Sequence, residues 1–246
     1  IDQFQLENPV LLPEAIKVGI INQSFYLKAA VEGGKSYFLQ RINHNIFQDV
    51  EGLQNNIDRV TSHIRQLLTK AGEADVERKV LRVVPTKDGK LYYRTPEGDY
   101  WRIYVLIENA LSYERIDAQS AFLAGQAFGN FQCQLASIDT DTLVESIPHF
   151  HDLAFRIEQL HEALNKDAAG RKAATQDIAD FLLQRAEEMC LAEQLYAEGK
   201  LAKRVNHCDT KVNNMLFDQQ GNPMCIVDLD TVMPGFVFSD FGDFIR

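Results

Sequence analysis

Short runs of β-branched and aromatic residues, separated by turn residues, characterise the first hundred positions of the chain. Two such runs, at Asn22–Ala30 and Ser36–Ile42, flank a pair of glycines and predict a β-hairpin. The apolar residues that follow recur at steps of four and three, which predicts an amphipathic helix. The apolar stripe of this helix consists of Leu53, Ile57, Val60, Ile64 and Leu67. Further short strands are predicted at Val80–Val84, Lys90–Tyr93 and Tyr100–Ile107.

From Asp117 onward the apolar residues recur at helical spacing. Helices are predicted at Ala118–Ile138, His151–Asn165 and Thr175–Ala197, and short strands after them at Arg204–His207, Met215–Asp218 and Met224–Asp228. A β-rich part therefore precedes a helical part, which predicts an α+β fold with two lobes. We place a small N-terminal lobe at residues 1–108 and a larger helical C-terminal lobe at residues 109–246, with the crossing near Ile107–Ala110.

Composition and charge limit the classes of partner. Lys and Arg number 25 against 35 Asp and Glu, and the net charge of −10 argues against nucleic acid. No apolar stretch approaches the ~20 residues of a membrane span. The four cysteines lack the spacing of a zinc site or a disulfide framework and fit a reducing compartment, so we expect a cytoplasmic protein. The chain lacks the usual signs of a terminus at Ile1 and Arg246, and we expect it to continue beyond both.

The segment His207–Asn214 reads His-Cys-Asp-Thr-Lys-Val-Asn-Asn, and Asp228 ends an apolar strand fourteen residues later. Phosphoryl transfer needs a carboxylate beside the acceptor hydroxyl and oxygen ligands for the Mg²⁺ that bridges the phosphates of ATP. In this order Asp209 would accept the hydroxyl proton, and Asn214 and Asp228 would hold Mg²⁺. Lys211 would place its ammonium group against the γ-phosphate. The pattern predicts a kinase that uses Mg²⁺ and ATP; the alternative is that these residues only cap turns and short strands.

Four residues near this pattern are expected to have structural roles. His207 is expected to hydrogen-bond the backbone and support the loop, and Cys208 to fill a small buried space. Asp240 and Asp243 are expected to cap turns, since Asp228 is better placed as the metal ligand.

The segment Arg204–Leu216 resembles the catalytic loop of the aminoglycoside-phosphotransferase-like kinases, and Ile226–Gly235 resembles a segment of the N-acetylhexosamine 1-kinases. Further matches are Ile21–Phe25, Phe38–Asn43, Ile147–His151 and Asp240–Arg246. The resemblance implies a bilobal, protein-kinase-like fold. It also implies transfer of phosphate from Mg·ATP to the anomeric hydroxyl of N-acetylglucosamine or N-acetylgalactosamine, so the expected partners are ATP and an amino sugar.

Two further expectations concern ligand contacts. Asp230 lies two residues beyond Asp228, so both carboxylates would face one side of an extended strand. We therefore expect Asp230 to contact a sugar hydroxyl or the metal; the alternative is a carboxylate that only caps a turn. Backbone groups at Ile107 and Asn109, where the lobes join, are expected to pair with adenine.

The N-terminal lobe departs from the family pattern in two places. Residues Lys17–Asn22 hold a single glycine, where kinases of this kind cover the phosphates with a glycine-bearing turn. The strand lysine that pairs with phosphate is also absent. Arg41 is expected to replace it, with Gln40 on the opposite face of the strand; the alternative is that Arg41 is a solvated charge at the edge of the sheet. The helical partner of Arg41 would be Glu51 or Asp49.

Three other classes stay open. A kinase of another small alcohol, such as an aminoglycoside, choline or homoserine, shares the catalytic loop but not the Asp228–Gly235 run. A protein kinase would carry an Ala-Pro-Glu segment after the metal aspartate, and this sequence has none. A pseudokinase that binds a nucleotide or a sugar without turnover would explain the glycine-poor turn and the missing lysine, whereas the intact set of Asp209, Asn214 and Asp228 argues against it.

Overall fold

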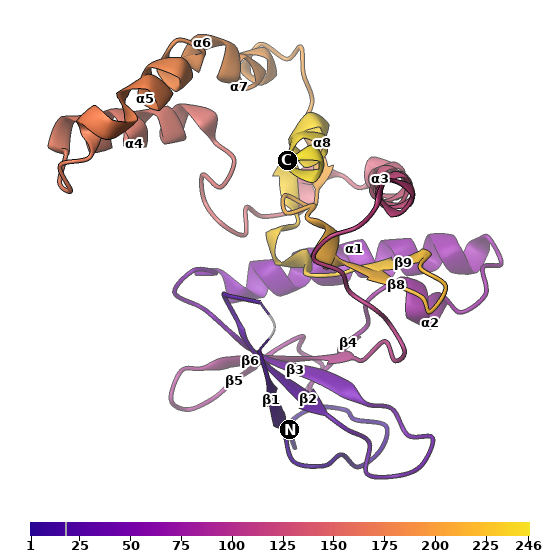
Figure 1. Cartoon of the computed structure of the whole chain (residues 1–246). Helices are drawn as coiled ribbons and strands as arrows, with labels where there is room; N and C mark the ends of the chain where they lie inside the picture. The colour runs from indigo at the N-terminus through magenta and orange to yellow at the C-terminus, as the bar shows by residue number, and fades with distance from the viewer. Residues whose placement is uncertain (18) are drawn as a thin grey trace. The chain divides into compact units, whose positions relative to one another are not determined.

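The computed structural model describes residues 1–17 and 19–246 (Figure 1). Val18, which belongs to the expected phosphate-covering turn, lies outside the described residues. The chain divides into two compact units, Ile1–Ile147 together with Arg204–Arg246, and Pro148–Lys203. The predicted α+β class is confirmed, with a β-sheet in the N-terminal region and helices after it. The lobe boundary predicted near Ile107 lies inside the first unit and stays a prediction.

A six-stranded antiparallel sheet forms the N-terminal part of the first unit. Its strands are β1 (Glu14–Ile16), β2 (Gln23–Leu27), β3 (Tyr37–Ile42), β4 (Val83–Val84), β5 (Tyr93–Arg94) and β6 (Tyr100–Val105), in the order β1-β2-β3-β6-β4 with β5 also paired to β6. The predicted hairpin is β2–β3, in which Phe25 lies opposite Leu39. The strand β1 has only three residues, too few for an apolar pattern to predict it.

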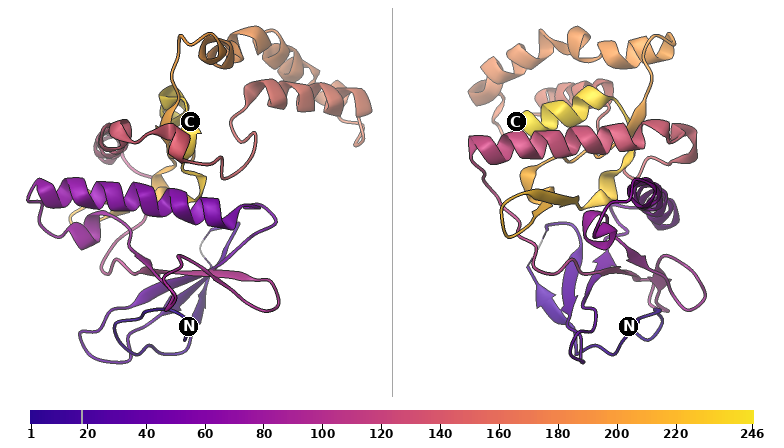
Figure 2. Two further views of the ribbon diagram at one scale, coloured as in Figure 1. Left: turned by 180° about the vertical axis from the view of Figure 1, so that it is seen from behind. Right: turned by 90° about the vertical axis from the view of Figure 1, so that its right-hand side faces the viewer.

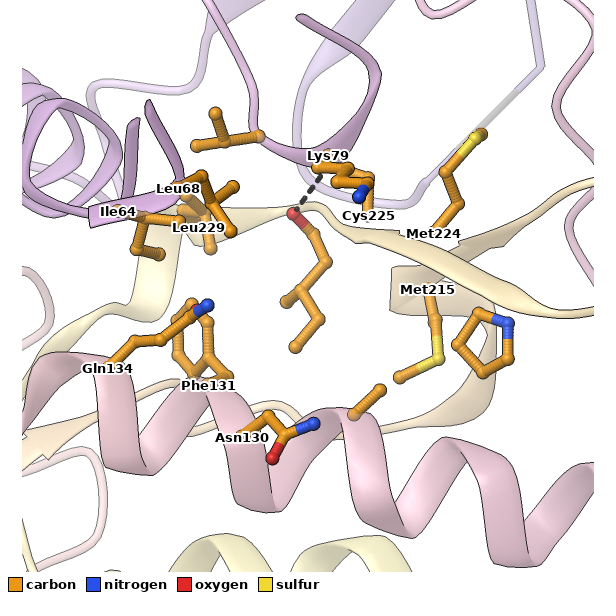
Figure 3. Close-up of a pocket in the computed structure, with 14 residues that line it drawn as sticks. Ile64, Leu68, Lys79, Asn130, Phe131, Gln134, Met215, Met224, Cys225 and Leu229 are labelled. Carbon is orange, nitrogen blue, oxygen red and sulfur yellow. Dashed lines mark hydrogen bonds between the residues drawn. The ribbon is translucent and has the colours of Figure 1, made fainter. Parts of the chain in front are cut away.

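The long helix α1 (Val50–Lys70) lies between the sheet and α3 (Ala118–Gln134), as Figures 1 and 2 show. Asp49 caps its first turn by accepting a hydrogen bond from Gly52 N at 2.8 Å. The predicted stripe is largely buried and packs with Ile42 and Tyr104 of the sheet in one core. This core fixes the sheet against the segment that carries the predicted catalytic loop, because Leu229 belongs to it as well. A single further turn of helix, α2 (Val76–Lys79), follows α1.

Short elements make up the C-terminal part of the first unit. They are η1 (Leu135–Ser137), η2 (Thr140–Thr142), β7 (Arg204–Asn206), η4 (Val212–Asn214), β8 (Met215–Phe217), β9 (Pro223–Ile226), η5 (Leu229–Thr231), β10 (Met233–Gly235) and the helix α8 (Val237–Ile245). The strand β8 pairs with β9, and β7 pairs with β10, both antiparallel. The sequence pattern predicts neither β10 nor α8, because Pro234 and Gly235 read as a turn and α8 has only nine residues.

The second unit is helical, with α4 (Leu153–Lys166), η3 (Lys172–Thr175), α5 (Gln176–Leu183), α6 (Ala186–Met189) and α7 (Leu191–Ala197). The single helix predicted at Thr175–Ala197 is therefore wrong. The amide of Arg185 bonds to Leu182 O, three residues back, which is the tighter 3₁₀ pattern. The spacing of apolar residues is nearly the same on both sides of this 3₁₀ turn, so the sequence pattern does not reveal the break. Throughout residues 1–17 and 19–246, no helix has the length and apolarity that crossing a membrane requires.

Candidate active site

The loop between β7 and β8 brings three of the predicted site residues into contact. Lys211 Nζ forms an ion pair with Asp209 Oδ2. The Asn214 amide donates to the same carboxylate oxygen at 3.0 Å and to the Asp209 carbonyl oxygen at 2.8 Å. The side chains of Asp209 and Lys211 are 25% and 45% exposed, so a ligand arriving from solvent can reach both.

The β8–β9 hairpin places Asn214 and Asp228 at the same end. Asn214 immediately precedes β8 and Asp228 follows β9, with Met215 opposite Ile226. Val227 N donates to Asn214 O at 2.9 Å, which extends the pairing to this end of the hairpin. The sequence predicts this proximity of two oxygen-bearing side chains, and the hairpin register accounts for it.

Asp228 combines an uncommon backbone conformation with a crowded carboxylate. Its φ of 59° is left-handed, a region that Asp occupies more readily than most residues. Although Asp228 is exposed as a residue, the protein packed around its carboxyl group raises the pKa of that group, and the charge of Asp230 raises it further. The positive charges of Lys211 and Arg102 act in the opposite direction. A divalent cation would relieve both the lost hydration and the repulsion.

The residues at this end of the hairpin fit Mg²⁺. The Asn214 amide nitrogen turns toward Asp209, which directs the amide oxygen elsewhere, and Asp228 adds carboxylate oxygens. These are the hard ligands that Mg²⁺ prefers. Within the part of the chain that the structure describes, no three His, Cys, Asp or Glu side chains group around a possible metal position. Mg²⁺ does not need such a cage, because it keeps water ligands and takes further oxygens from nucleotide phosphates.

The helix α8 holds the backbone of the catalytic loop through two aspartates. Asp240 accepts hydrogen bonds from His207 N at 2.9 Å and Cys208 N at 2.8 Å, and Asp243 accepts one from Thr210 N at 2.7 Å. The prediction that the two aspartates cap turns is wrong, because they lie three residues apart on one face of a helix. Their Asp-x-x-Asp spacing is the one signal in the sequence that points to this role.

His207 and Cys208 have the structural roles that the sequence predicts. The buried His207 ring contacts Val227 O through Nε2 at 3.0 Å, and Asp209 N through Nδ1 at 3.3 Å. A carbonyl oxygen can only accept and a backbone N–H can only donate, so in these contacts Nε2 is the donor and Nδ1 the acceptor. Burial raises the pKa of the Cys208 thiol well above its ordinary value, which makes the thiol a poor nucleophile.

Asp230 does not lie where the sequence pattern places it. Leu229–Thr231 form a 3₁₀ turn, so the extended strand expected to align the carboxylates of Asp228 and Asp230 is wrong. The Asp230 side chain is 5% exposed and pairs with Arg102, at 2.5 Å from Oδ1 to Nη1. Sequence reasoning misses Arg102 altogether, because its partner is 128 positions away and no local pattern marks the pair.

Arg41 lies on the opposite face of the sheet from Asp230. In the β3–β6 register Gln40 is opposite Arg102, and successive residues of a strand point to opposite faces. Gln40 Oε1 indeed accepts from Arg102 Nη2 at 2.7 Å, whereas Arg41 pairs with Asp99 at 2.5 Å. The segment Arg204–Arg246, which carries the predicted catalytic loop, is called the catalytic segment. The face of β3 that meets Asp230 of this segment through Arg102 therefore carries Gln40.

The remaining predicted nucleotide contacts are placed as follows. The expected pairing of Arg41 with Glu51 or Asp49 is wrong: Asp49 is the N-cap of α1, and Glu51 is exposed in its first turn. Ile107 is buried, and Asn109 has a left-handed φ of 54° with its carbonyl oxygen accepting from Gln219 Nε2. Adenine binding by the backbone at Ile107 and Asn109 stays a prediction.

These features are those of a phosphotransferase, and comparison with known proteins identifies its family. The sequence profile of the phosphotransferase enzyme family (APH) matches residues 14–246. The chain belongs to this family.

Solved structures of kinases share the fold. Spectinomycin phosphotransferase APH(9)-Ia, in complex with ADP and spectinomycin, is 15% identical with a TM-score of 0.56, over 96% of this chain and 68% of its own. Aminoglycoside phosphotransferase APH(4)-Ia, a thermostable mutant with ADP and hygromycin B, is 14% identical with a TM-score of 0.55. The match covers 95% of this chain and 71% of that protein. Amicoumacin kinase hAmiN, with AMP-PNP and Ca²⁺, is 15% identical with a TM-score of 0.60. The match covers 94% of this chain and 62% of that protein. The likeness confirms the predicted kinase-like fold.

Proposed function

We propose that this protein transfers the γ-phosphoryl group of Mg·ATP to a hydroxyl group of a small molecule, and that the acceptor is the anomeric hydroxyl of an N-acetylhexosamine. The observation that carries the proposal is the contact of Asp209 with Lys211 and Asn214, at the hairpin end that also bears Asp228. Together these side chains offer a base, a cation and two oxygen ligands, which are the parts that phosphoryl transfer needs.

The proposed chemistry assigns a role to each side chain. Lys211 and Asn214 both contact Asp209 Oδ2, so Oδ1 is the oxygen left to take the proton of the attacking hydroxyl. Lys211 is exposed enough to exchange this carboxylate for the γ-phosphate, where its charge would stabilise the transferring group. Asn214 and Asp228 would hold Mg²⁺, which when bound neutralises charge on the phosphates.

ATP is proposed as the donor on the strength of the family and the fold. The three similar solved structures hold ADP or AMP-PNP. On this chain we propose the backbone at Ile107 and Asn109 as the adenine contact. Arg41 has no place in the proposal, because it points away from the catalytic segment and pairs with Asp99. Glu51 has none either, since its proposed role depends on Arg41.

The choice of acceptor rests on the resemblance of Ile226–Gly235 to the N-acetylhexosamine 1-kinases. An anomeric hydroxyl is more acidic than an ordinary alcohol, so a carboxylate such as Asp209 is a sufficient base. A second candidate is an aminoglycoside or related antibiotic, because two of the similar solved structures contain spectinomycin and hygromycin B.

A panel of acceptors tests the proposal. The protein would be incubated with ATP, Mg²⁺ and, in turn, N-acetylglucosamine, N-acetylgalactosamine, glucose, galactose, choline, homoserine or spectinomycin, and products identified by phosphorus NMR. We expect anomeric phosphates from the two N-acetylhexosamines. Their kcat/KM should exceed that of glucose by up to ~10⁴–10⁵-fold if the pocket hydrogen-bonds the acetamido group. Faster turnover of spectinomycin would favour the second candidate, and ATP binding without turnover of any acceptor would indicate a pseudokinase.

A further inference from the structure

One buried ion pair joins the N-terminal sheet to the turn that follows Asp228. Arg102 on β6 is 1% exposed and has the largest fully buried side chain in the described part of the chain. Both of its terminal nitrogens contact the Asp230 carboxylate, at 2.5 Å and 2.8 Å. Charges buried this deeply are tolerated only when they are paired and hydrogen-bonded, so the pair is a fixed part of the structure.

Further hydrogen bonds hold both ends of the pair. Gln40 Oε1 accepts from Arg102 Nε at 3.0 Å and from Nη2 at 2.7 Å. Asn22 donates to Asp230 Oδ2 at 2.6 Å, and Asn22 Oδ1 in turn accepts from Asn43 N at 2.9 Å. Gln40 lies on β3, while Asn22 and Asn43 flank β2 and β3. The sheet, and not the turn alone, therefore determines where Asp230 lies.

The fixed position of Asp230 has consequences for Asp228. Only the buried Leu229 separates the two aspartates, and Thr231 Oγ1 donates to His207 O at 2.7 Å on the other side of the turn. The turn from which Asp228 projects is thus held at several points. Arg102 also neutralises one of two neighbouring carboxylates that would otherwise repel each other.

We propose that Arg102 is a positioning residue for the metal site: through Asp230 it holds the turn in the form that presents Asp228 to Mg²⁺. The inference rests on the proposed function only as far as Mg·ATP binding. Kinases with this type of catalytic loop take a positive charge from a lysine on the third strand. Here Gln40 occupies the inward-facing position of β3, and the inward-facing cation comes from the neighbouring strand β6. Asp230 Oδ1 lies 2.5 Å from Arg102 Nη1, and Oδ2 accepts hydrogen bonds from Arg102 Nη2 and Asn22 Nδ2.

The test replaces the ion pair by apolar side chains of similar size, in the double variant Arg102→Met/Asp230→Leu. Exchanges of this kind often keep or raise stability, and the half-buried Gln40 can bind water in place of the guanidinium group. Calorimetric titration would measure ATP affinity over a series of Mg²⁺ concentrations, and thermal unfolding would measure Tm. Arg82→Met is the matched control, since it removes solvent-accessible ion pairs with Glu7 and Glu77 from the same unit. Arg102→Lys keeps the charge and loses the planar, two-pronged geometry.

We expect the double variant to need roughly 10–100-fold more Mg²⁺ for half-maximal ATP binding. Losses of this size are typical when residues that orient the metal ligands are removed. Its Tm should stay close to that of the wild-type protein. Arg102→Lys should show a smaller increase in the Mg²⁺ requirement, and Arg82→Met none.

An unchanged Mg²⁺ requirement in a folded double variant would overturn the inference and leave the proposed function standing. If the double variant does not fold, Arg102→Lys decides in the same way, because an unchanged requirement there contradicts a positioning role. A wild-type protein that binds no ATP at any Mg²⁺ concentration would instead overturn the proposed function.

Discussion

The catalytic segment, Arg204–Arg246, and the helical unit, Pro148–Lys203, hold their polar side chains in different ways. In the catalytic segment, buried side chains such as Asp240 and Thr231 bond to the backbone of residues far away in the sequence. In the helical unit, Ala179 is the one buried residue among the described positions. Side-chain bonds there, such as Lys166 to Glu162, join exposed residues one helical turn apart. Substitutions should therefore alter geometry in the first region and change little in the second.

The largest effect is expected at the proposed base. Asp209→Asn keeps the size of the side chain and removes its ability to take a proton, so kcat should fall by roughly 10²–10⁴-fold. ATP affinity, measured by calorimetry, should stay near that of the wild-type protein, because the role proposed for Asp209 is toward the acceptor and not the nucleotide. Asp180→Asn in α5, where the aspartate is exposed, is the matched control and should turn over normally. Activity above about a tenth of the wild-type value in Asp209→Asn would refute the assignment.

The next effect concerns stability. Asp240→Ala leaves the buried amides of His207 and Cys208 without their acceptor, at about 1–3 kcal/mol for each unsatisfied group. This loss of stability is partly offset, because removing Asp240 also removes a carboxylate whose ionised form is disfavoured by burial, as its raised pKa indicates. Urea unfolding would measure the difference, and kcat should fall with it as the loop loses its support. Equal stability of Asp240→Ala and Asp180→Ala would show that α8 does not hold the loop.

The same contrast explains what could be predicted from the sequence. Asp209, Lys211 and Asn214 lie within six residues, and one hairpin adds Asp228, so a local pattern is enough to predict that the four residues lie near one another. The direct contacts of Lys211 and Asn214 with Asp209 are not among the predictions. The pair of Arg102 and Asp230 depends on how β6 meets a distant turn, and strand spacing carries no information about such a partner.

The fold shows the same limit. Apolar spacing predicts α1, because one buried face imposes a period on the sequence. Runs of β-branched and aromatic residues on either side of a glycine turn predict the β2–β3 hairpin. Apolar spacing does not predict the break at Arg185, since a 3₁₀ turn hardly changes that period. Nor does it reveal that α8 contacts the catalytic loop, because Asp240 and Asp243 bond to backbone amides, which carry no side-chain signature.

The reactivity of two thiols also distinguishes the two regions. Cys208 lies in the catalytic segment and Cys190 in the helical unit. Only the thiolate reacts with iodoacetamide, and burial raises the pKa of Cys208 well above its ordinary value. Cys190, in the helical unit, is only half-buried. At pH 8 we expect Cys208 to be alkylated at least roughly tenfold more slowly than Cys190. Peptide mass spectrometry after short pulses would measure both rates, and in urea they should converge. Equal rates in the folded protein would show that the catalytic loop opens readily.

The smallest effect is expected in the helical unit, at the ion pair between Glu162 and Lys166. The two side chains are 70% and 71% exposed and lie one turn apart on α4, so water competes for both charges. Glu162→Gln should change the free energy of unfolding by less than about 0.5 kcal/mol, and 1 M salt should remove most of that difference. Urea unfolding at low and high salt, with Asp240→Ala measured alongside, would test this directly. If Glu162→Gln changed the free energy of unfolding as much as Asp240→Ala does, the Glu162 side chain would be making a contact that its exposure does not indicate. The contrast between the two regions would then be wrong.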